Sequence, residues 1–289
     1  MRMNCFNKPF SGFISVIVST YNWPQALDLV LEALLKQNDS SFEIIIADDG
    51  SKADTKSLIE HFQKNSAIKI THVWQPDCGF RAAENRNRGI AAANGEYLIF
   101  LDGDSIPQYD FVKQHRRLAQ ANYFISGSRI LMGPTLTQLF IDKKLAFPGV
   151  NNKFCNKIFW VRQRLLRGIN KVIPLFLKSF YIPRFSIKSS SLNRVRSCNL
   201  AVWAHDCRKV DGFDAVYTGW GYEDSDFALR LYNVGIKRKF GHCATEIFHL
   251  YHPSNPAPNL ESNANRVLQR IQSKHIQAEK GISKLEPVD

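Results

Sequence analysis

The chain has 289 residues, of which 44% are hydrophobic and 12% aromatic, so it can bury a sizeable core and is not intrinsically disordered. Its formal net charge of +12 indicates an anionic partner, such as a nucleotide, a nucleic acid or a phospholipid surface. No apolar run approaches the ~20 residues of a transmembrane helix, and the apolar stretch 13–19 is too short for a secretory signal, so we expect a cytoplasmic protein.

The first 130 residues alternate between strand and helix patterns. The nearly unbroken apolar run FISVIVS at residues 13–19 is typical of a strand buried on both faces, and a helix is predicted to begin near Pro24. Further strands are predicted at residues 42–47, 68–74 and 96–101, with a helix at residues 81–93. This order predicts an α/β fold with right-handed crossovers and a mostly parallel sheet.

The remainder of the chain has a different character. Residues 151–181 mix basic and apolar side chains without any acidic residue, and they are either an interfacial amphipathic segment or a solvated helix that covers the sheet. Residues 184–196 resemble a flexible loop, a strand follows at residues 198–203, and a final amphipathic helix is predicted at roughly residues 260–281.

Polar side chains follow three of the predicted strands. They are Thr20, Tyr21 and Asn22 after the first strand, Asp48 and Asp49 after the second, and Asp102, Gly103 and Asp104 after the strand at residues 96–101. In an open parallel sheet, ligands bind in the crevice outside the carboxyl ends of the strands. The three clusters therefore predict one shared site.

Asp102 and Asp104 suit a divalent cation. Two carboxylates separated by one small residue can turn toward a single Mg²⁺ or Mn²⁺, which can bridge a pyrophosphate and stabilise a departing nucleoside diphosphate. Alone, such a pair is more often a solvated turn, and its position directly after a buried strand favours the metal site. Asp49 can accept hydrogen bonds from a base or ribose, although a turn that caps the next helix is the alternative.

Two further groups carry possible chemistry. Residues 220–224 (WGYED) form an aromatic, glycine-containing loop before a helix that opens with Glu223 and Asp224. Such a loop suits sugar contacts and a general base, whereas the alternative is acidic residues that complement a helix dipole. His249 and His252 can complete a metal site held by carboxylates, or they are ordinary packed or surface histidines.

Four motifs in this order resemble the family 2 glycosyltransferases with a GT-A fold, over roughly residues 13–255. The motifs are VIVSTYN, IIIADDGS, GFRAAENRNRGIAAANGEYLIFLDGDSIP and GWGYEDSDFALRL. The last is similar to a motif of galactosyltransferase-type enzymes and of the bacterial chondroitin polymerase. The resemblance implies a Rossmann-like central sheet flanked by helices, with a nucleotide-sugar-binding half at residues 1–130. It also implies an acceptor-binding and catalytic half at residues 131–259, followed by a C-terminal helical tail at residues 260–289.

The resemblance also implies an inverting, metal-dependent hexosyl or N-acetylhexosaminyl transfer from a UDP-sugar. The implied nucleotide-sugar contacts are Thr20, Tyr21, Asn22, Asp49, Arg81, Asp102 and Gly103. The implied metal ligands are Asp104, Asp102 and His249, with His252 less favoured than His249. Asp224 is implied as the general base beside Glu223, and the implied sugar contacts are Trp220, Gly221 and Asn199.

Three features depart from the family pattern. An Asp usually follows DDGS closely, but here Lys52 and Ala53 intervene and the next acidic residue is Asp54. Tyr222 replaces a small residue of the family motif, which narrows the predicted acceptor site. The QxxRW motif of processive synthases is absent, which argues against processive extrusion of a polymer.

The acceptor is inferred from charge. The positive charge and residues 151–181 favour an anionic, membrane-attached glycan, such as lipopolysaccharide core or a capsule precursor, and peripheral association with the inner face of the cytoplasmic membrane. No nucleic-acid motif is recognised, so no nucleic-acid partner is expected. The alternatives are a non-catalytic nucleotide-sugar-binding module and a sugar nucleotidyltransferase. The first would not need both acidic motifs, and the second would usually have a glycine-rich phosphate loop after the first strand.

Overall fold

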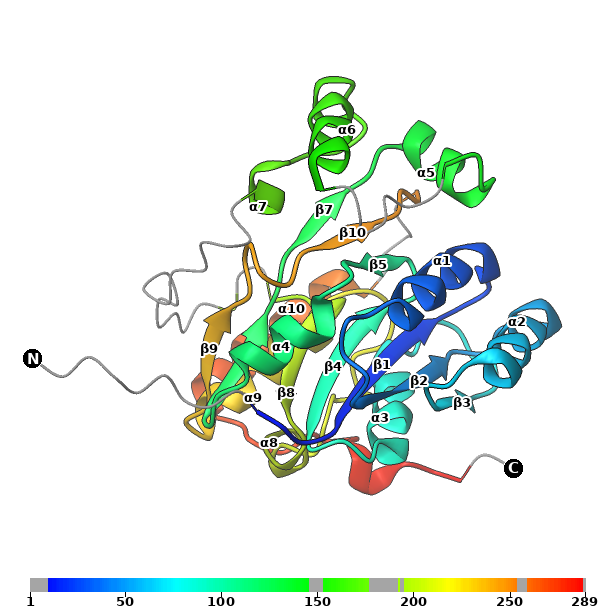
Figure 1. Ribbon diagram of the computed structural model, residues 1–289. Coiled ribbons are helices and arrows are strands. Elements are labelled where there is room, and N and C mark those ends of the chain that lie inside the picture. The colour runs from blue at the N-terminus through cyan, green and yellow to red at the C-terminus, as the bar shows by residue number, and fades with distance from the viewer. Residues whose placement is uncertain (1–9, 146–152, 177–191, 193–194, 254–258, 288–289) are drawn as a thin grey trace, which may run out of the picture.

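A computed structural model (Figure 1) describes residues 10–145, 153–176, 192, 195–253 and 259–287. Its strands are β1 (Ile14–Thr20), β2 (Phe42–Asp48), β3 (Ile70–Trp74), β4 (Tyr97–Asp102), β5 (Ser105–Pro107), β6 (Tyr123–Ser126), β7 (Arg129–Leu131), β8 (Asn199–Trp203), β9 (Lys237–Phe240) and β10 (Ile247–His249). Its helices are α1 (Pro24–Leu35), α2 (Ala53–Asn65), α3 (Ala82–Ala92), α4 (Phe111–Leu118), α5 (Pro134–Ile141), α6 (Lys153–Leu165), α7 (Ile173–Phe176), α8 (Ala204–Lys209), α9 (Glu223–Asn233), α10 (Leu260–Ser273) and the 3₁₀ helix η3 (Ile282–Lys284).

The central sheet confirms the predicted α/β fold. In the described part of the chain its strand order is β3-β2-β1-β4-β8-β6-β9. Strands β3, β2, β1 and β4 are mutually parallel, β8 runs antiparallel to both β4 and β6, and β9 is parallel to β6. The parallel part comes from the first 102 residues, where β1, β2 and β3 are each followed by a helix. The helices after β1 and β3 are the two that the sequence predicted there.

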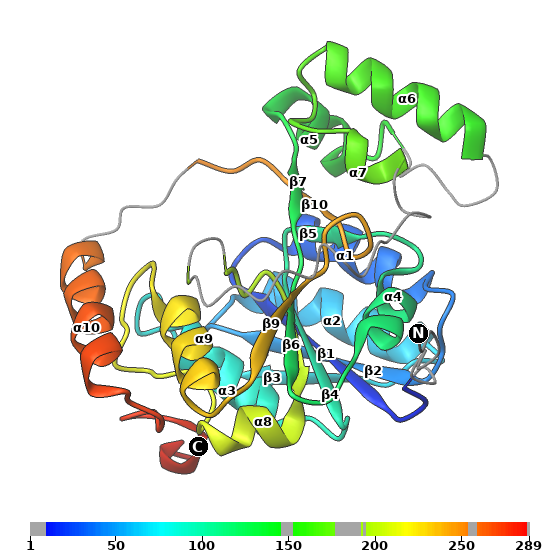
Figure 2. The same cartoon turned by 90° about the vertical axis from the view of Figure 1, so that its left-hand side faces the viewer.

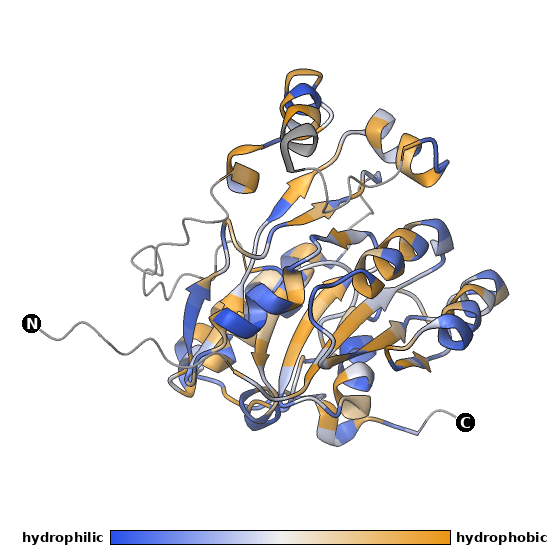
Figure 3. Ribbon diagram, in the orientation of Figure 1, coloured by the Kyte–Doolittle hydropathy of each residue, from blue (hydrophilic) through white to orange (hydrophobic). Residues whose placement is uncertain are grey.

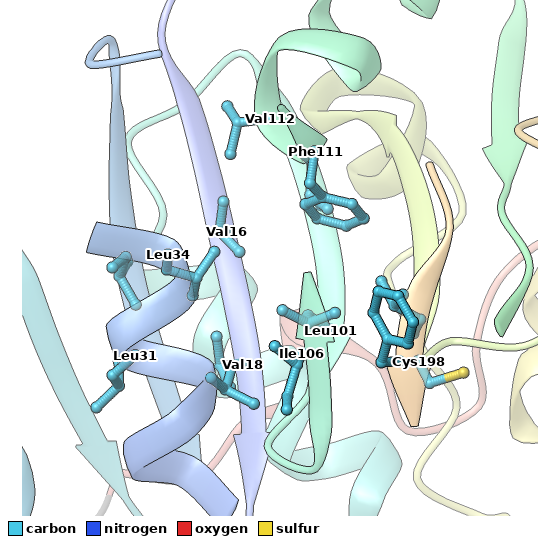
Figure 4. Close-up of a cluster of buried hydrophobic side chains, with 14 of the residues drawn as sticks. Val16, Val18, Leu31, Leu34, Leu101, Ile106, Phe111, Val112 and Cys198 are labelled. Carbon is cyan, nitrogen blue, oxygen red and sulfur yellow. The ribbon is translucent and has the colours of Figure 1, made fainter. Parts of the chain in front are cut away.

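Both faces of the central sheet are covered, which explains the unbroken apolar run in β1. Val16 and Val18 pack with Leu31 and Leu34 of α1 on one face (Figure 4). Ile17 points to the opposite face, where it joins a second cluster of buried residues from α3 and α9. Figure 3 shows the same pattern as mainly hydrophobic strands between helices of mixed character.

A small second sheet has the order β5-β10-β7. Strand β5 begins one residue after Asp104 and pairs antiparallel with β10, so that Ser105 lies opposite His249. These strands are three residues long, which is too short for a recognisable hydrophobic period in the sequence. Because β5 follows closely after β4, its pairing with β10 places the end of β10 next to the end of β4.

Helices α5, α6 and α7 form a separate group at the end of the molecule beyond β7 and β10 (Figure 2). Trp160 of α6 stacks on Phe248 of β10, with ring centroids 4.3 Å apart. Helix α6 therefore covers the smaller sheet, on which its buried Trp160 packs. Residues 177–181 and most of the predicted loop at 184–196 lie outside the described residues.

The last helix is shorter than predicted. Helix α10 ends at Ser273, because Lys274 adopts a left-handed backbone conformation with a φ of 50°. Its buried Arg270 pairs with Asp226 of α9 at 2.7 Å and with Asp214 at 2.8 Å, so α10 is attached to the body of the fold. Among all the described helices, none has both the length and the apolar character that crossing a membrane requires.

Candidate active site

A cleft of about 640 Å³ opens where the carboxyl ends of β1 and β4 meet the end of β10. Eight of the predicted site residues line it: Thr20, Tyr21, Asp49, Asp102, Gly103, Asp104, Trp220 and His249. Further residues that line the cleft had no predicted role, or a less favoured one: Trp23, Phe80, Asn85, Arg86, Arg129, Leu131, Met132, Tyr251 and His252. The predicted meeting of the strand ends is therefore present.

The turn after β4 is held tightly against the end of β1. Asp102 lies opposite Ser19 in the parallel register, and the Gly103 N–H donates a hydrogen bond to the Ser19 carbonyl at 2.7 Å. A Cβ atom at Gly103 would lie 3.0 Å from Thr20 Oγ1, which is closer than an ordinary contact. Because Gly103 has no side chain, the turn that carries Asp102 and Asp104 can pack closely against the backbone at the end of β1.

Asp104 lies between two imidazoles. Its Oδ1 is 3.1 Å from His249 Nδ1, and its Oδ2 is 3.3 Å from His252 Nε2. One ligand atom from each of the three residues lies within 4.8 Å of the others. Burial favours a raised pKa for Asp104, but hydrogen bonds from His249 and His252 outweigh it and hold the pKa well below its usual value. The same contact raises the pKa of His252.

This donor set fits a divalent transition-metal ion. Two imidazoles and one carboxylate suit such an ion better than Mg²⁺, which is held mainly by oxygen ligands. The structure brings both histidines to Asp104, whereas the sequence favoured His249 alone. Asp102 also lines the cleft, and its Oδ1 accepts a hydrogen bond from Arg86 Nη2 at 3.4 Å. Burial raises the pKa of Asp102, and Arg86 opposes that rise.

Asp49 also lines the cleft and is largely buried. Its Oδ2 accepts a hydrogen bond from the backbone N–H of Arg81 at 2.9 Å, and its Oδ1 accepts one from the Gln75 amide. Burial raises the pKa of Asp49. Nearby, the Tyr21 hydroxyl donates to Asp77 at 2.8 Å, which leaves a half-exposed aromatic ring beside the cleft.

Arg81, the arginine predicted to contact the nucleotide, does not line the cleft, whereas Arg86 does. Arg81 stands directly before α3, and its guanidinium is occupied by Glu84 at 3.1 Å and by the Pro76 carbonyl, outside the cleft. Arg86 lies on the inner face of α3 and is only 5% exposed. The sequence pattern AENRNRG contains four helical cations or amides in a row, and nothing in it marks which one faces the cleft.

Arg86 joins the two acidic motifs. Its Nη2 contacts Asp102 Oδ1, and its Nη1 donates to Glu223 Oε1 at 3.2 Å. The ring of Phe213 lies under the guanidinium, 5.4 Å from its Cζ. The end of β4 and the start of α9 are therefore linked by one buried cation.

The loop before α9 is shaped by unusual backbone conformations. Gly221 has a φ of 104° and Tyr222 a φ of 75°, and the Asn263 amide of α10 donates to the Gly221 carbonyl at 3.1 Å. Trp220 reaches the cleft, whereas Gly221, Glu223 and Asp224 are not among the residues that line it. Burial and the neighbouring Glu223 raise the pKa of Asp224 to about 7, and Arg86 opposes the shift.

Two predicted residues have structural contacts instead. Asn199 is 1% exposed, and its amide donates to the Ser128 carbonyl at 3.0 Å and to the Thr245 carbonyl, so the expected sugar contact is wrong. Asn22 does not line the cleft, because its Oδ1 accepts the Lys52 N–H at 2.9 Å and its own N–H donates to Ser51 Oγ at 2.8 Å. Both asparagines satisfy backbone groups in loops that frame the site.

Two family models match the sequence of this chain. Residues 15–168 match the family model of glycosyl transferase family 2, and residues 181–253 match the model of the N-terminal domain of galactosyltransferase. Validoxylamine A glucosyltransferase of Streptomyces hygroscopicus subsp. jinggangensis is 26% identical over 77% of this chain and 52% of its own length. Chondroitin synthase of Escherichia coli is 26% identical over 90% of this chain and 38% of its own length. The chain thus spans about half or less of these curated relatives.

Solved structures share the fold. The mannosyltransferase PcManGT from Pyrobaculum calidifontis, in complex with GDP-Man and Mn²⁺, superposes with a TM-score of 0.60 at 16% identity, covering 97% of this chain and 70% of that one. TarS of S. aureus in complex with UDP superposes with a TM-score of 0.57 at 16% identity, covering 94% of this chain and 68% of that one.

Proposed function

Because the chain belongs to glycosyl transferase family 2, we propose that it transfers a sugar from a UDP-sugar to a hydroxyl group of a glycan, with inversion and with the help of a divalent cation. The observation that carries this proposal is the cluster of Asp104, His249 and His252 at the strand ends, on the same cleft as Asp49. A cation-binding group and a nucleotide-binding group on one cleft are what a nucleoside diphosphate donor requires.

On the nucleotide side, Asp49 is fixed by two hydrogen bonds and accepts a further one from the base. Thr20 and Gly103 lie at the close contact between β1 and the turn after β4, where a sugar or ribose hydroxyl can approach the backbone. The half-exposed ring of Tyr21 offers a flat apolar surface at the edge of the cleft. These residues position the donor with its diphosphate toward Asp104.

On the diphosphate side, Asp104, His249 and His252 would hold the cation. Asp102, which lines the same cleft, would supply an additional carboxylate oxygen. Mn²⁺ fits the two imidazoles better than Mg²⁺ does. When bound, it supplies Lewis-acid stabilisation of the negative charge that develops on the departing UDP.

On the acceptor side, Asp224 takes the proton from the attacking hydroxyl. Its pKa of about 7 keeps a large ionised fraction at neutral pH and still lets it bind a proton as the new bond forms. Arg86 fixes the adjacent Glu223 and so holds the start of α9 toward β4. Trp220, half-exposed in the cleft, packs on the apolar face of a sugar ring.

We propose an anionic glycan attached to the cytoplasmic membrane as the acceptor, such as lipopolysaccharide core or a capsule precursor, with the protein located at the inner face of that membrane. Support comes from the net charge of +12 and from the basic character of α6 and the loop that follows it.

The test is release of UDP from a panel of UDP-sugars in the absence of acceptor, with Mn²⁺ and with EDTA. The proposal predicts release from one sugar that requires Mn²⁺, which would also identify the donor. If no sugar gives release and UDP does not bind in a metal-dependent way, the UDP-sugar assignment is wrong.

A further inference from the structure

Exposed apolar side chains gather on α6, the loop after it and α7, at the end of the molecule away from the central sheet (Figure 2). Ile158, Leu165, Leu166 and Ile173 are 55%, 79%, 64% and 66% exposed. The inner face of α6 is fixed, because Trp160 is buried against Phe248. The outer face therefore stays directed to solvent. Large apolar side chains grouped on one surface in this way mark an interaction site.

The same surface carries uncompensated positive charge. Arg162, Arg164 and Arg167 are exposed, and within the part of the chain that the structure describes none of them pairs with a carboxylate. No acidic residue occurs anywhere between positions 151 and 181. We call the four apolar residues and these three arginines the α6–α7 patch.

We propose that the α6–α7 patch binds the surface of an anionic phospholipid membrane. A helix with leucine and isoleucine beside arginine can bury its apolar side chains at the boundary between headgroups and acyl chains, while the guanidinium groups contact the headgroup phosphates. A second copy of the chain is a poorer occupant, because it would bring two sets of unpaired arginines together. Figure 3 shows hydrophilic and hydrophobic residues side by side on α6.

The patch is connected directly to the cleft. The loop between α6 and α7 pairs with β7 and the residue after it, through a bridge between Met132 and Ile169 and a hydrogen bond from the Leu131 N–H to Asn170 Oδ1 at 2.9 Å. Leu131 and Met132 both line the cleft. A patch bound to a membrane therefore holds the cleft close to the lipid surface. This consequence rests on the proposed transferase function, and it makes a membrane-anchored acceptor the substrate class.

Co-sedimentation of the full chain with vesicles tests the proposal. The wild-type protein is expected to bind vesicles of phosphatidylcholine mixed with phosphatidylglycerol at low salt and to bind pure phosphatidylcholine vesicles far more weakly. The R162Q/R164Q/R167Q variant should bind the anionic vesicles roughly 100-fold more weakly, since each basic residue near such a surface contributes about fivefold. The L165S/L166S variant should also lose most of its binding, because it removes two of the most exposed apolar side chains.

Two matched controls separate the patch from general charge and general apolarity. K56Q/K64Q/K237Q removes three exposed cations elsewhere, and L268S/I271S removes two exposed apolar residues from α10. Both controls should bind as the wild type does. The proposal is overturned if the wild type does not prefer anionic vesicles, if either patch variant keeps its binding, or if a control loses as much as its patch counterpart. UDP release without acceptor, measured on the same samples, reports on the transferase proposal separately.

Discussion

Asp224 is the residue whose environment most directly matches a chemical role. Burial and Glu223 raise its pKa to about 7, so its ionised fraction changes within the physiological range. Only the ionised carboxylate can accept a proton. We therefore expect kcat to rise with pH through about 7 and to level off above it. At pH 5 only about 1% of Asp224 is ionised. A pH profile of kcat that is flat between pH 5 and 8 would contradict the assignment.

Replacement of the same residue gives a second test. Asp224→Asn keeps the size of the side chain and removes the base, so turnover should fall by ~10²–10⁴-fold while UDP affinity stays close to that of the wild type. Steady-state kinetics and UDP titration measure the two effects. Asp54→Asn, which changes an exposed carboxylate on α2, is the control and should leave both values unchanged. Near-normal turnover in Asp224→Asn would exclude it as the base.

Both histidines beside Asp104 are expected to contribute to the affinity for the metal ion. Replacing either His249 or His252 with alanine removes one donor from the cluster, so Mn²⁺ affinity should fall by more than the ~10–100-fold that loss of an outer-shell partner costs. Titration with Mn²⁺, followed by electron paramagnetic resonance, measures this directly. His61→Ala on the exposed surface of α2 is the control. If His252→Ala binds Mn²⁺ normally, the cluster is a hydrogen-bonded arrangement without a metal role.

Residue types at strand ends could be predicted from the sequence, whereas the direction of each side chain could not. Asp49 and Asp104 line the cleft as expected, because the register of the parallel strands brings their ends together, and His249 reaches the cleft through the pairing of β10 with β5. The sequence pointed to Arg81 and Asn199, whereas Arg86 lines the cleft and Asn199 is buried. Which face of a helix or strand meets the cleft depends on packing with α9 and with the residues before β10.

At the scale of elements, α9 and α10 are joined by buried charge. Asp226 of α9 accepts hydrogen bonds from Arg230 and Arg270, each at 2.7 Å, and Asp214 binds Arg270 as well. Near the start of α10, the Asn263 amide donates hydrogen bonds to the Thr218 and Gly221 carbonyls of the loop that contains Trp220. Helix α10 therefore supports the loop to which we assign acceptor binding.

This network predicts a large effect from a single change. Arg270→Ala leaves Asp214 and Asp226 buried with fewer partners, so the free energy of unfolding should fall by about 3–5 kcal/mol. Arg266→Ala, one turn earlier on the same helix, removes a long and partly exposed pair with Glu279 and should cost no more than about 1 kcal/mol. Urea denaturation of both variants measures the difference. Equal losses would show that the buried pairs do not stabilise the contact between α9 and α10.

The length and burial of a strand decide whether its sequence pattern can be recognised. Strands β1, β2 and β4 are long and buried on both faces, so their apolar runs are distinctive. Strands β5, β7 and β10 are too short for that, and they exist because they pair with one another. The end of α10 at Ser273 depends on the backbone conformation of Lys274, a residue type that does not mark a helix end.

At the scale of the whole molecule, separate elements supply the groups to which we assign the donor, the cation and the acceptor. The parallel half of the sheet supplies Asp49, and the small sheet brings His249 to Asp104, so that all three residues line one cleft. The start of α9 is tied to β4 through Arg86. The α6 group, for which we propose membrane binding, is linked to the same cleft through β7.

The proposed function requires that the nucleotide and the cation bind together in this cleft. Calorimetric titration of UDP into the protein, with Mn²⁺ and with EDTA, measures this coupling. We expect clear binding that is much tighter with Mn²⁺, and loss of that gain in Asp104→Asn, because Asp104 is the carboxylate between the two imidazoles. Equal UDP affinity with Mn²⁺ and with EDTA, or an unchanged gain in Asp104→Asn, would show that the two ligands do not bind together here.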